Sequence, residues 1–160
     1  MTNDKNSTDH SSFPFGKLPM RDMSQSLPIA LLRGREAIMT GFRNMLHEYD
    51  LTDQQWRVLR ALAETPELEV VELAERCVIL QPSVSRILKK LEDRKLVSRR
   101  ICQQDRRRSH ITITAKGKDL FQLIAPQSEE LYKVINGKFG SEKMQHLLHL
   151  LNDLTESMAD

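Results

Sequence analysis

The residues that could do chemistry gather between Arg76 and Lys118, and the chemistry they indicate is the binding of a polyanion. This segment carries 13 Lys and Arg against 3 Asp and Glu, a net charge of +10. The rest of the 160 residues carries 11 Lys and Arg against 19 Asp and Glu, a net charge of −8. A basic surface beside an acidic body suggests that one face meets a nucleic acid or another polyanion.

Catalytic and metal-binding patterns are missing from the sequence. No nucleophile–base pair, glycine-rich phosphate loop or metal-hydrolase motif occurs, so an enzyme is not expected. His146 and His149 are three residues apart, but no matching Cys or carboxylate pattern accompanies them, so we expect neither a metal nor a cofactor. Cys77 and Cys102 lack a Cys-x-x-Cys spacing and are interpreted as free thiols. Because Cys102 lies in an arginine-rich strand, a redox role stays open for it.

A basic helix from Gln81 to Arg94 is the first part of the predicted binding surface. A short helix over residues 71–76 precedes it, and two short helices joined by a tight turn indicate a helix-turn-helix, whose second helix enters the major groove of DNA. The spacing of three, four and seven predicts one buried side, formed by Val84, Ile87, Leu88 and Leu91. The residues expected to face DNA are Gln81, Pro82, Ser83, Ser85, Arg86, Lys89 and Lys90. Gln81 and Arg86 have the reach for base edges, whereas the two lysines suit phosphates; the alternative is a solvated charged face.

A basic hairpin is the second part. Residues 97–102 and 110–114 alternate with period two and predict two strands, joined by a loop over residues 103–108. The loop contains Asp105-Arg106-Arg107-Arg108. Three adjacent arginines repel one another and favour a negative partner such as a narrow minor groove, and Asp105 can hold Arg107 in a fixed direction. The alternative is a loop that is merely soluble.

The remaining segments predict helices that position these parts. Apolar spacing indicates a long helix from near Ser24 to Asp50 with Pro28 in its first turn. A capping box at Thr52 and Gln55 begins a second helix, ended by Thr65-Pro66. Its expected buried stripe is Trp56, Leu59, Leu62 and Ala63. A fifth helix, capped by Thr114, has the stripe Leu120, Leu123, Ile124, Leu131 and Val134, and we expect Gly137 and Gly140 to break it. A last helix begins at Ser141.

Size and composition favour one soluble domain or subunit. The hydrophobic fraction is 39% and the charged fraction 29%, and no apolar run approaches the roughly 20 residues that a membrane span needs. Residues 1–22 are read as a disordered tail without a secretory signal, so a cytoplasmic location and no membrane partner are predicted. The apolar stripes of the first and last helices need a partner, either a second subunit or each other within one chain.

The quoted motifs resemble those of the MarR (multiple antibiotic resistance regulator) family. The resemblance rests on Leu51–Trp56, Leu73–Arg76, Pro82–Arg86, Asp105–Arg107 and Ile111–Gly117. It implies a mainly α fold with a small β-hairpin, a winged helix-turn-helix over residues 51–117, and an obligate homodimer assembled by residues 23–50 and 118–160. It further implies that Arg107, oriented by Asp105, enters the minor groove, while Arg106 and Arg108 touch the backbone. The chain departs from the family pattern at Val78, Leu80 and Lys95, where glycine, a Ser or Thr cap, and glycine are frequent.

Within that family, residues 24–33 and 54–60 are similar to regulators of homoprotocatechuate (4-hydroxyphenylacetate) degradation. The similarity implies a repressor that binds a pseudo-palindromic operator and is released by an aromatic acid such as 4-hydroxyphenylacetate or 3,4-dihydroxyphenylacetate. Arg33 is the first choice for the carboxylate clamp, with an intersubunit salt bridge as the alternative. Trp56 is a candidate aromatic wall or a core residue. Further candidates for this ligand site are Ser26, Arg35, His47 and Arg60.

Three other functions stay open at this point. They are a nonspecific architectural DNA binder, a protein-binding winged-helix module, and a MarR-type regulator of another process such as stress or efflux. A nonspecific binder would show an affinity set almost wholly by salt, with little preference for an operator. The sequence identifies neither the operator nor the inducer.

Overall fold

The computed structural model describes residues 12–13, 16–17, 21–102 and 108–159 of the chain. It divides into two compact units, residues 1–40 and 41–160. In the first unit, strands β1 (Ser12–Phe13) and β2 (Gly16–Lys17) pair antiparallel, and the 3₁₀ turn η1 (Met23–Gln25) leads into helix α1 (Leu27–His47), which continues into the second unit. Asp22 caps η1, because its carboxylate accepts a hydrogen bond from the backbone N–H of Ser24 at 2.8 Å.

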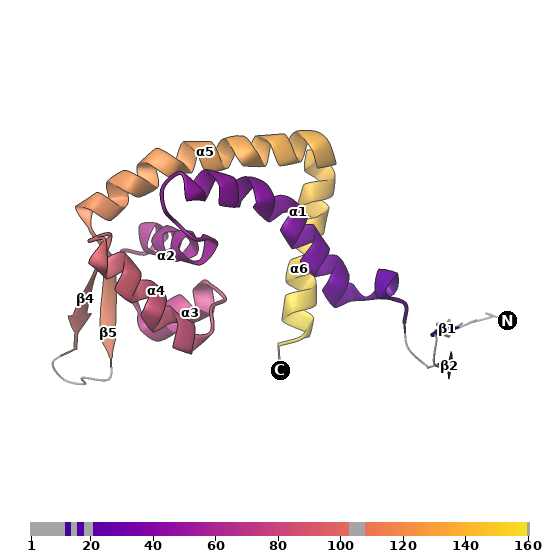
Figure 1. The fold of residues 1–160 in the computed structure, drawn as a ribbon, viewed down its shortest axis with the longest axis horizontal. Coiled ribbons are helices and arrows are strands. Elements are labelled where there is room, and N and C mark those ends of the chain that lie inside the picture. The colour runs from indigo at the N-terminus through magenta and orange to yellow at the C-terminus, as the bar shows by residue number, and fades with distance from the viewer. Residues whose placement is uncertain (1–11, 14–15, 18–20, 103–107, 160) are drawn as a thin grey trace. The chain divides into compact units, whose positions relative to one another are not determined.

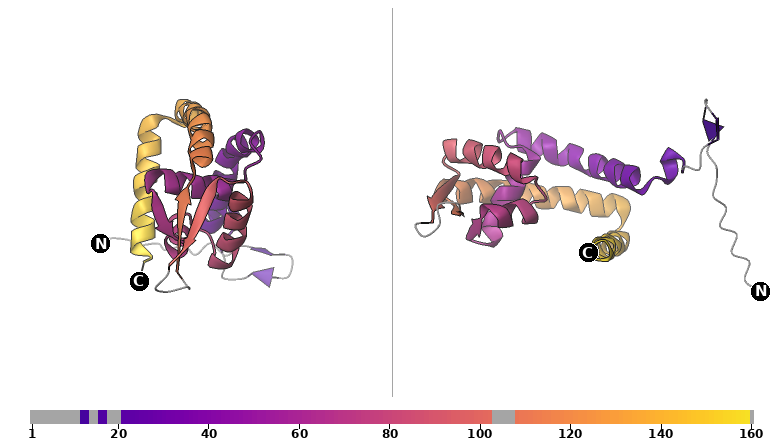
Figure 2. Two further views of the ribbon diagram at one scale, coloured as in Figure 1. Left: turned by 90° about the vertical axis from the view of Figure 1, so that its left-hand side faces the viewer. Right: turned by 90° about the horizontal axis from the view of Figure 1, so that it is seen from below.

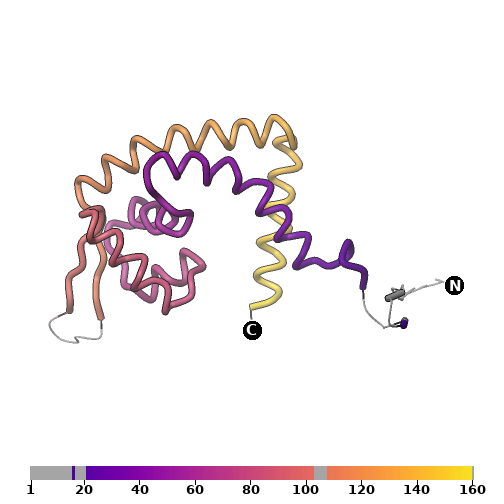
Figure 3. The backbone as a smooth tube through the Cα atoms, viewed as in Figure 1, coloured from indigo at the N-terminus to yellow at the C-terminus, as the bar shows by residue number. Residues whose placement is uncertain are grey.

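The second unit holds the remaining helices and a three-stranded antiparallel sheet of order β3-β5-β4. Figure 1 labels α2 to α6 and the two hairpin strands β4 and β5. Its elements are α2 (Asp53–Glu64), β3 (Glu67–Glu69), α3 (Val70–Arg76), α4 (Gln81–Asp93), β4 (Val97–Ile101), β5 (Ser109–Ile113), α5 (Ala115–Phe139) and α6 (Ser141–Ser157). The β4–β5 hairpin extends beyond helices α2 to α4, and α5 leaves the sheet before α6 turns away from it (Figure 2). Figure 3 shows the short turn that joins α3 to α4. The predicted fold class, mainly α with a small β-hairpin, is therefore confirmed.

The core lies where α2, α3 and α4 meet the sheet and the start of α5. The four apolar residues predicted for the buried side of α4 are all buried, as are Trp56, Leu59 and Leu62 on α2. Ala63 is exposed and Ala61 is buried instead, because the buried side of the last turn of α2 is formed by Ala61 and Leu62 rather than by Leu62 and Ala63. Gly117 lies in a close approach, since a Cβ there would be 2.1 Å from the carbonyl oxygen of Leu96.

Two predicted helix starts have the expected caps. Thr52 accepts a hydrogen bond from the N–H of Gln55 at 3.2 Å, and the Gln55 side chain accepts one from the N–H of Thr52 at 2.9 Å, which completes the capping box. Thr114 caps α5 by accepting a hydrogen bond from the N–H of Gly117 at 3.0 Å. Short polar signals in the sequence therefore set these helix starts.

Three helices end at a left-handed residue that is not glycine. Among the described residues other than glycine, the positive φ angles are 52° at Asp50, 49° at Val78 and 60° at Lys95. Each end has the two backbone hydrogen bonds of a Schellman motif: for α3, Val78 N–H donates to the Glu75 carbonyl at 3.0 Å and Ile79 N–H to the Ala74 carbonyl at 2.9 Å. Val78 and Lys95, which stand where the family often has glycine, therefore adopt the left-handed conformation themselves.

Each of these ends also receives a hydrogen bond from a distant cation. Arg94 donates to the carbonyls of Asp50 at 2.6 Å and Tyr49 at 2.9 Å, after the end of α1. Arg57 on α2 donates to the Cys77 and Val78 carbonyls, and Lys116 on α5 donates to the Arg94 carbonyl at 3.1 Å. A cation at a helix C-terminus satisfies the last carbonyls and complements the helix dipole.

Several predicted element bounds were wrong. Strand β3 was missed because its three residues are too short to show a clear period. Gly137 does not break α5, which continues to Phe139 and ends at Gly140, because a glycine costs a helix only about 1 kcal/mol. Leu123 and Val134 are exposed on α5 rather than part of its buried stripe. Helix α1 begins at Leu27, after η1, rather than near Ser24.

Replacing Val78 by glycine is expected to raise the free energy of unfolding by about 1 kcal/mol. A left-handed conformation costs a β-branched residue about 1–2 kcal/mol, and the side chain is 83% exposed, so little packing is lost. Urea denaturation at fixed protein concentration measures the change. Val71→Gly is the matched control, because Val71 is also exposed but lies inside α3, where glycine should lower stability. A lower free energy of unfolding for Val78→Gly would show that the left-handed backbone at Val78 is not strained.

Candidate nucleic-acid interface and ligand site

Helix α4 presents most of the predicted DNA-facing residues to solvent. Gln81, Pro82, Ser85, Arg86, Lys89 and Lys90 are exposed, whereas Ser83 is half-buried. Leu80 is the N-cap, and its side chain makes no capping hydrogen bond. Amphipathic packing causes this division, since the four apolar residues of α4 face the core. The exposed face can offer an amide, hydroxyl groups and three cations to a groove.

One of those cations already has a protein partner. Lys89 donates a hydrogen bond to the Asp93 carboxylate one turn later, with a distance of 2.5 Å between Nζ and Oδ1. This hydrogen bond, supported by the charge of Asp93, raises the pKa of Lys89. A phosphate that binds Lys89 must therefore compete with Asp93.

The part of the hairpin next to its loop is held by carboxylates of β3. Arg100 on β4 pairs with Glu67 at 3.2 Å, and His110 on β5 has its Nδ1 3.4 Å from the same carboxylate. Arg108 donates two hydrogen bonds to Glu69, with 3.0 Å between Nε and Oε2. The hydrogen bond from Arg108 lowers the pKa of Glu69. The predicted contact of Arg108 with the DNA backbone therefore starts from a guanidinium that binds Glu69 in the free protein.

The predicted tip of the hairpin lies outside the described residues. This applies to Asp105, Arg106 and Arg107, and their roles stay predictions from the sequence. The sequence reasoning missed Glu67 and Glu69, because the segment Glu67-Leu68-Glu69, in which Leu68 is buried, is too short to predict a strand from its period alone. Its pairing of Leu68 with Ile111 places both carboxylates at the edge of the hairpin.

A second group of side chains joins α2 to α5. The Trp56 ring stacks on Phe121, with ring centroids 5.2 Å apart and an interplanar angle of 20°. Arg60, one turn after Trp56, has its Nε 3.4 Å from the Glu64 carboxylate and lies close enough to the Tyr132 side chain to interact with it. Burial lowers the pKa of Arg60, but the interactions with Tyr132 and Glu64 outweigh it and raise the pKa. Tyr132 also meets Phe42 edge to face at 5.2 Å.

The predicted ligand residues fall into two sets. Trp56, Arg60 and His47 lie in the unit of residues 41–160, where Trp56 is 7% exposed and His47 is exposed at the end of α1. Ser26, Arg33 and Arg35 lie in the unit of residues 1–40. There Arg35 pairs with Glu36 at 2.8 Å, and the charge of Arg33 contributes, after the hydrogen bonds from Ser24, to lowering the pKa of Asp22. Sequence reasoning missed Phe121 and Tyr132, although a spacing of 11 residues puts both on one face of α5.

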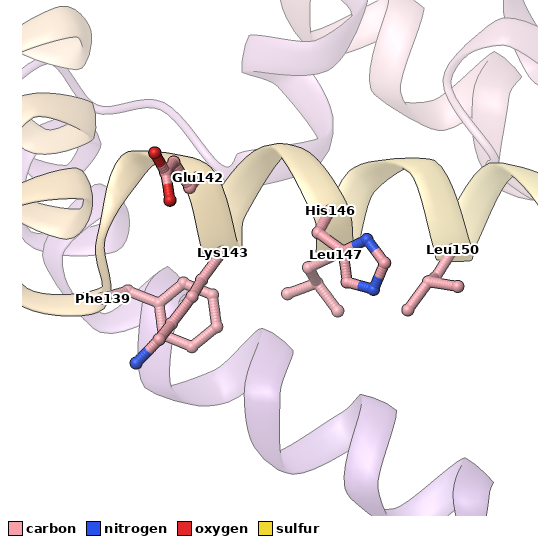
Figure 4. Close-up of a pocket in the computed structure, with 6 residues that line it drawn as sticks. All are labelled: Phe139, Glu142, Lys143, His146, Leu147 and Leu150. Atoms are coloured by element: carbon pink, nitrogen blue, oxygen red, sulfur yellow. The ribbon is translucent and has the colours of Figure 1, made fainter.

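Helix α6 has no buried residue and carries an open apolar surface. Its side chains Leu147 and Leu150 project to the same side as Phe139, the last residue of α5 (Figure 4). These three side chains line a cavity of about 470 Å³ together with Glu142, Lys143 and His146. Among the described residues, no group of three His, Cys, Asp or Glu side chains could hold a metal ion. None of the described helices combines the length and the apolar composition of a membrane-spanning segment. Burial raises the pKa of the Cys77 thiol, which disfavours a reactive thiolate there.

Known proteins share this architecture and sequence. The MarR family pattern matches residues 49–108. The homoprotocatechuate degradative operon repressor of Escherichia coli is 44% identical over 131 residues, which cover 82% of this chain and 88% of the repressor. The chain belongs to the MarR family.

Two further proteins are similar to this chain over most of its length. The regulator FarR of Neisseria gonorrhoeae is 39% identical over 87% of this chain and 95% of its own length. The crystal structure of NadR in complex with 4-hydroxyphenylacetate is 40% identical, with a TM-score of 0.72 over 86% of this chain and 97% of that one. MarR family regulators are winged-helix proteins that bind DNA as dimers. The two short helices α3 and α4, followed by the β4–β5 hairpin, have the element order of a winged helix-turn-helix.

Replacing Asp93 by asparagine is expected to raise DNA affinity about fivefold at low salt, because it frees Lys89 and removes a negative charge near the phosphates. The slope of log affinity against log salt should become steeper by about one. Fluorescence anisotropy with a labelled duplex measures both. Asp153→Asn is the control, since this exposed acid on α6 pairs with His149 and changes the net charge equally. An equal gain in both variants would show that only net charge matters.

Proposed function

We propose that this MarR-type regulator is a repressor of 4-hydroxyphenylacetate or homoprotocatechuate catabolism that a phenolic acid releases from a pseudo-palindromic operator. The observation that carries the proposal is the group of Arg60 and Trp56 on α2 with Tyr132 on α5. The similar protein NadR, whose crystal structure contains 4-hydroxyphenylacetate, supports the choice of ligand. Such a regulator acts on DNA in the cytoplasm. The similarity to the operon repressor of Escherichia coli supports the process it controls.

The chain divides its tasks between two regions in this proposal. Residues 51–117 bind DNA, with Gln81 and Arg86 at base edges and the wing arginines, including Arg106 and Arg107, at the minor groove and backbone. Residues 23–50 and 118–160 form the dimer. The exposed apolar side chains Phe139, Leu147 and Leu150 support this second assignment, because an apolar surface of this kind is buried in an oligomer.

The phenolic acid finds the three groups it needs near Arg60. A carboxylate needs a cation, a ring needs an apolar or aromatic wall, and a phenol needs a hydrogen-bonding partner. Arg60 supplies the cation and Tyr132 a hydroxyl, while Trp56 backs the site from the core, where it stacks on Phe121. Arg60 is therefore a stronger candidate for the carboxylate clamp than Arg33, which was the first choice from sequence.

Helix α2 also provides a mechanism for release. Arg60 faces Tyr132, whereas Arg57 on the same helix donates hydrogen bonds to the Cys77 and Val78 carbonyls at the turn between α3 and α4. A shift of α2 on ligand binding therefore moves the end of the turn that starts the recognition helix. The ligand favours the released state only to the extent that it binds that state more tightly.

Operator binding tests the DNA half of the proposal. Arg86→Ala is expected to weaken binding to a selected operator by at least about tenfold, since one base contact contributes about 1–3 kcal/mol, while binding to random duplex changes little. The change is measured by mobility-shift titration at fixed salt, with Lys138→Ala on α5 as the control. Equal affinity of the unaltered protein for operator and random DNA would favour a nonspecific architectural role instead.

Calorimetry with 4-hydroxyphenylacetate tests the ligand half. Arg60→Met should weaken binding by more than about tenfold, because a charged hydrogen bond contributes about 1.5–3 kcal/mol, and should leave operator affinity intact without ligand. Arg33→Met is the matched variant on α1. If only Arg33→Met loses ligand binding, the carboxylate clamp lies on α1, and the assignment to Arg60 is wrong.

A further inference from the structure

The turn between α3 and α4 exposes two aliphatic side chains. Val78 is 83% exposed and Leu80 is 80% exposed, the two highest values among the large hydrophobic side chains that the structure describes. Leu80 precedes Gln81 directly and is the N-cap of α4. An apolar side chain of this size therefore stands where the recognition helix begins.

Leucine is a poor residue for this position in the free protein. Ser, Thr, Asp or Asn at an N-cap stabilises a helix by about 1 kcal/mol relative to an apolar residue, because its oxygen accepts a backbone hydrogen bond. The Leu80 side chain makes no such bond and is not covered by the described part of the chain. Neither the local structure nor the core explains a leucine here.

The surface around Leu80 indicates what covers it. Gln81 follows Leu80 directly and is exposed, and Ser85 and Arg86 are exposed just over one turn later, so this end of α4 offers the polar and cationic groups of a DNA-binding surface. In helix-turn-helix proteins, the N-terminal residues of the recognition helix contact base edges. In the major groove, the apolar group on a base edge is the C5-methyl of thymine.

We propose that Leu80 is a specificity-determining residue that packs against the C5-methyl group of a thymine in each operator half-site. The proposal rests on the DNA-binding function proposed above and adds a base identity to it. Leu80 is a better candidate than Val78, because the Val78 carbonyl is bound by Arg57 and its left-handed backbone belongs to the end of α3. Val78 therefore supplies a matched control of similar exposure.

Replacement of thymine by deoxyuridine tests this contact, since it removes only the methyl group. The operator is first selected in vitro with the full-length protein, and each symmetric pair of thymines is then replaced by deoxyuridine in turn. We expect one pair to weaken binding about fourfold for each half-site, or about fifteenfold for both, the effect of about one buried methyl group in each. The other pairs should change the affinity little.

The variants then assign the contact to a residue. Leu80→Ser and Leu80→Asn should bind thymine and deoxyuridine operators equally at that pair, whereas Val78→Ala should keep the difference seen with the unaltered protein. Both Leu80 variants place a good cap on α4 and should remain folded, which circular dichroism checks. If both variants unfold, Leu80 is a structural residue and the inference is overturned.

The outcomes separate this inference from the proposed function. An operator that is bound over random DNA but shows no sensitive thymine pair overturns the inference alone, as does a methyl effect that persists in both Leu80 variants. The second result would mean that another residue reads the methyl group. A protein that selects no operator overturns both proposals.

Discussion

Hydrogen bonds from distant cations to the ends of helices are the interactions on which this structure depends. Helices α1, α3 and α4 each end at a left-handed residue with a side chain, and each end is bound by a cation from another element. Arg94, which closes α4, binds the end of α1, and its own carbonyl is bound by Lys116 at the start of α5. The chain thus connects successive elements of the DNA-binding unit through carbonyls that would otherwise need water. These bonds also hold backbone angles that Asp50, Val78 and Lys95 adopt only at a cost.

Among these cations, Arg57 connects the hydrogen bonds at helix ends to the proposed function. It lies between Trp56 and Arg60 in position along α2, yet it binds the turn before the recognition helix, while Arg60 interacts with Tyr132 on α5. One helix therefore touches both the proposed effector site and the helix-turn-helix. Because packed helices move as rigid elements, a small shift of α2 changes both contacts together. The proposed coupling between the effector site and the helix-turn-helix therefore has to cross only the width of α2.

The sequence predicted those elements whose signals are local. The spacing of apolar residues defined α4, and the polar caps at Thr52 and Thr114 defined the starts of α2 and α5. Strand β3 and the roles of Glu67 and Glu69 could not be predicted, because a three-residue strand is stabilised by pairing with Ile111 and its neighbours rather than by its own propensity. The partnership of Arg60 with Tyr132, 72 positions later in the chain, likewise depends on the packing of α2 against α5. Gly137 was misjudged because one glycine costs a helix only about 1 kcal/mol, which the rest of the 25-residue helix α5 outweighs.

The distribution of charge bears on how such a surface distinguishes an operator from other DNA. Free cations attract any duplex, so a basic surface without internal partners binds strongly and with little selectivity. Here Lys89 is paired with Asp93, Arg100 with Glu67 and Arg108 with Glu69, so each must exchange a carboxylate for a phosphate. This exchange reduces the gain from phosphate contacts alone, and the reduction applies equally to every sequence. The uncharged and base-reading groups at the start of α4 then contribute a larger share of the total binding free energy. A modest number of base contacts is therefore enough to distinguish an operator from other DNA.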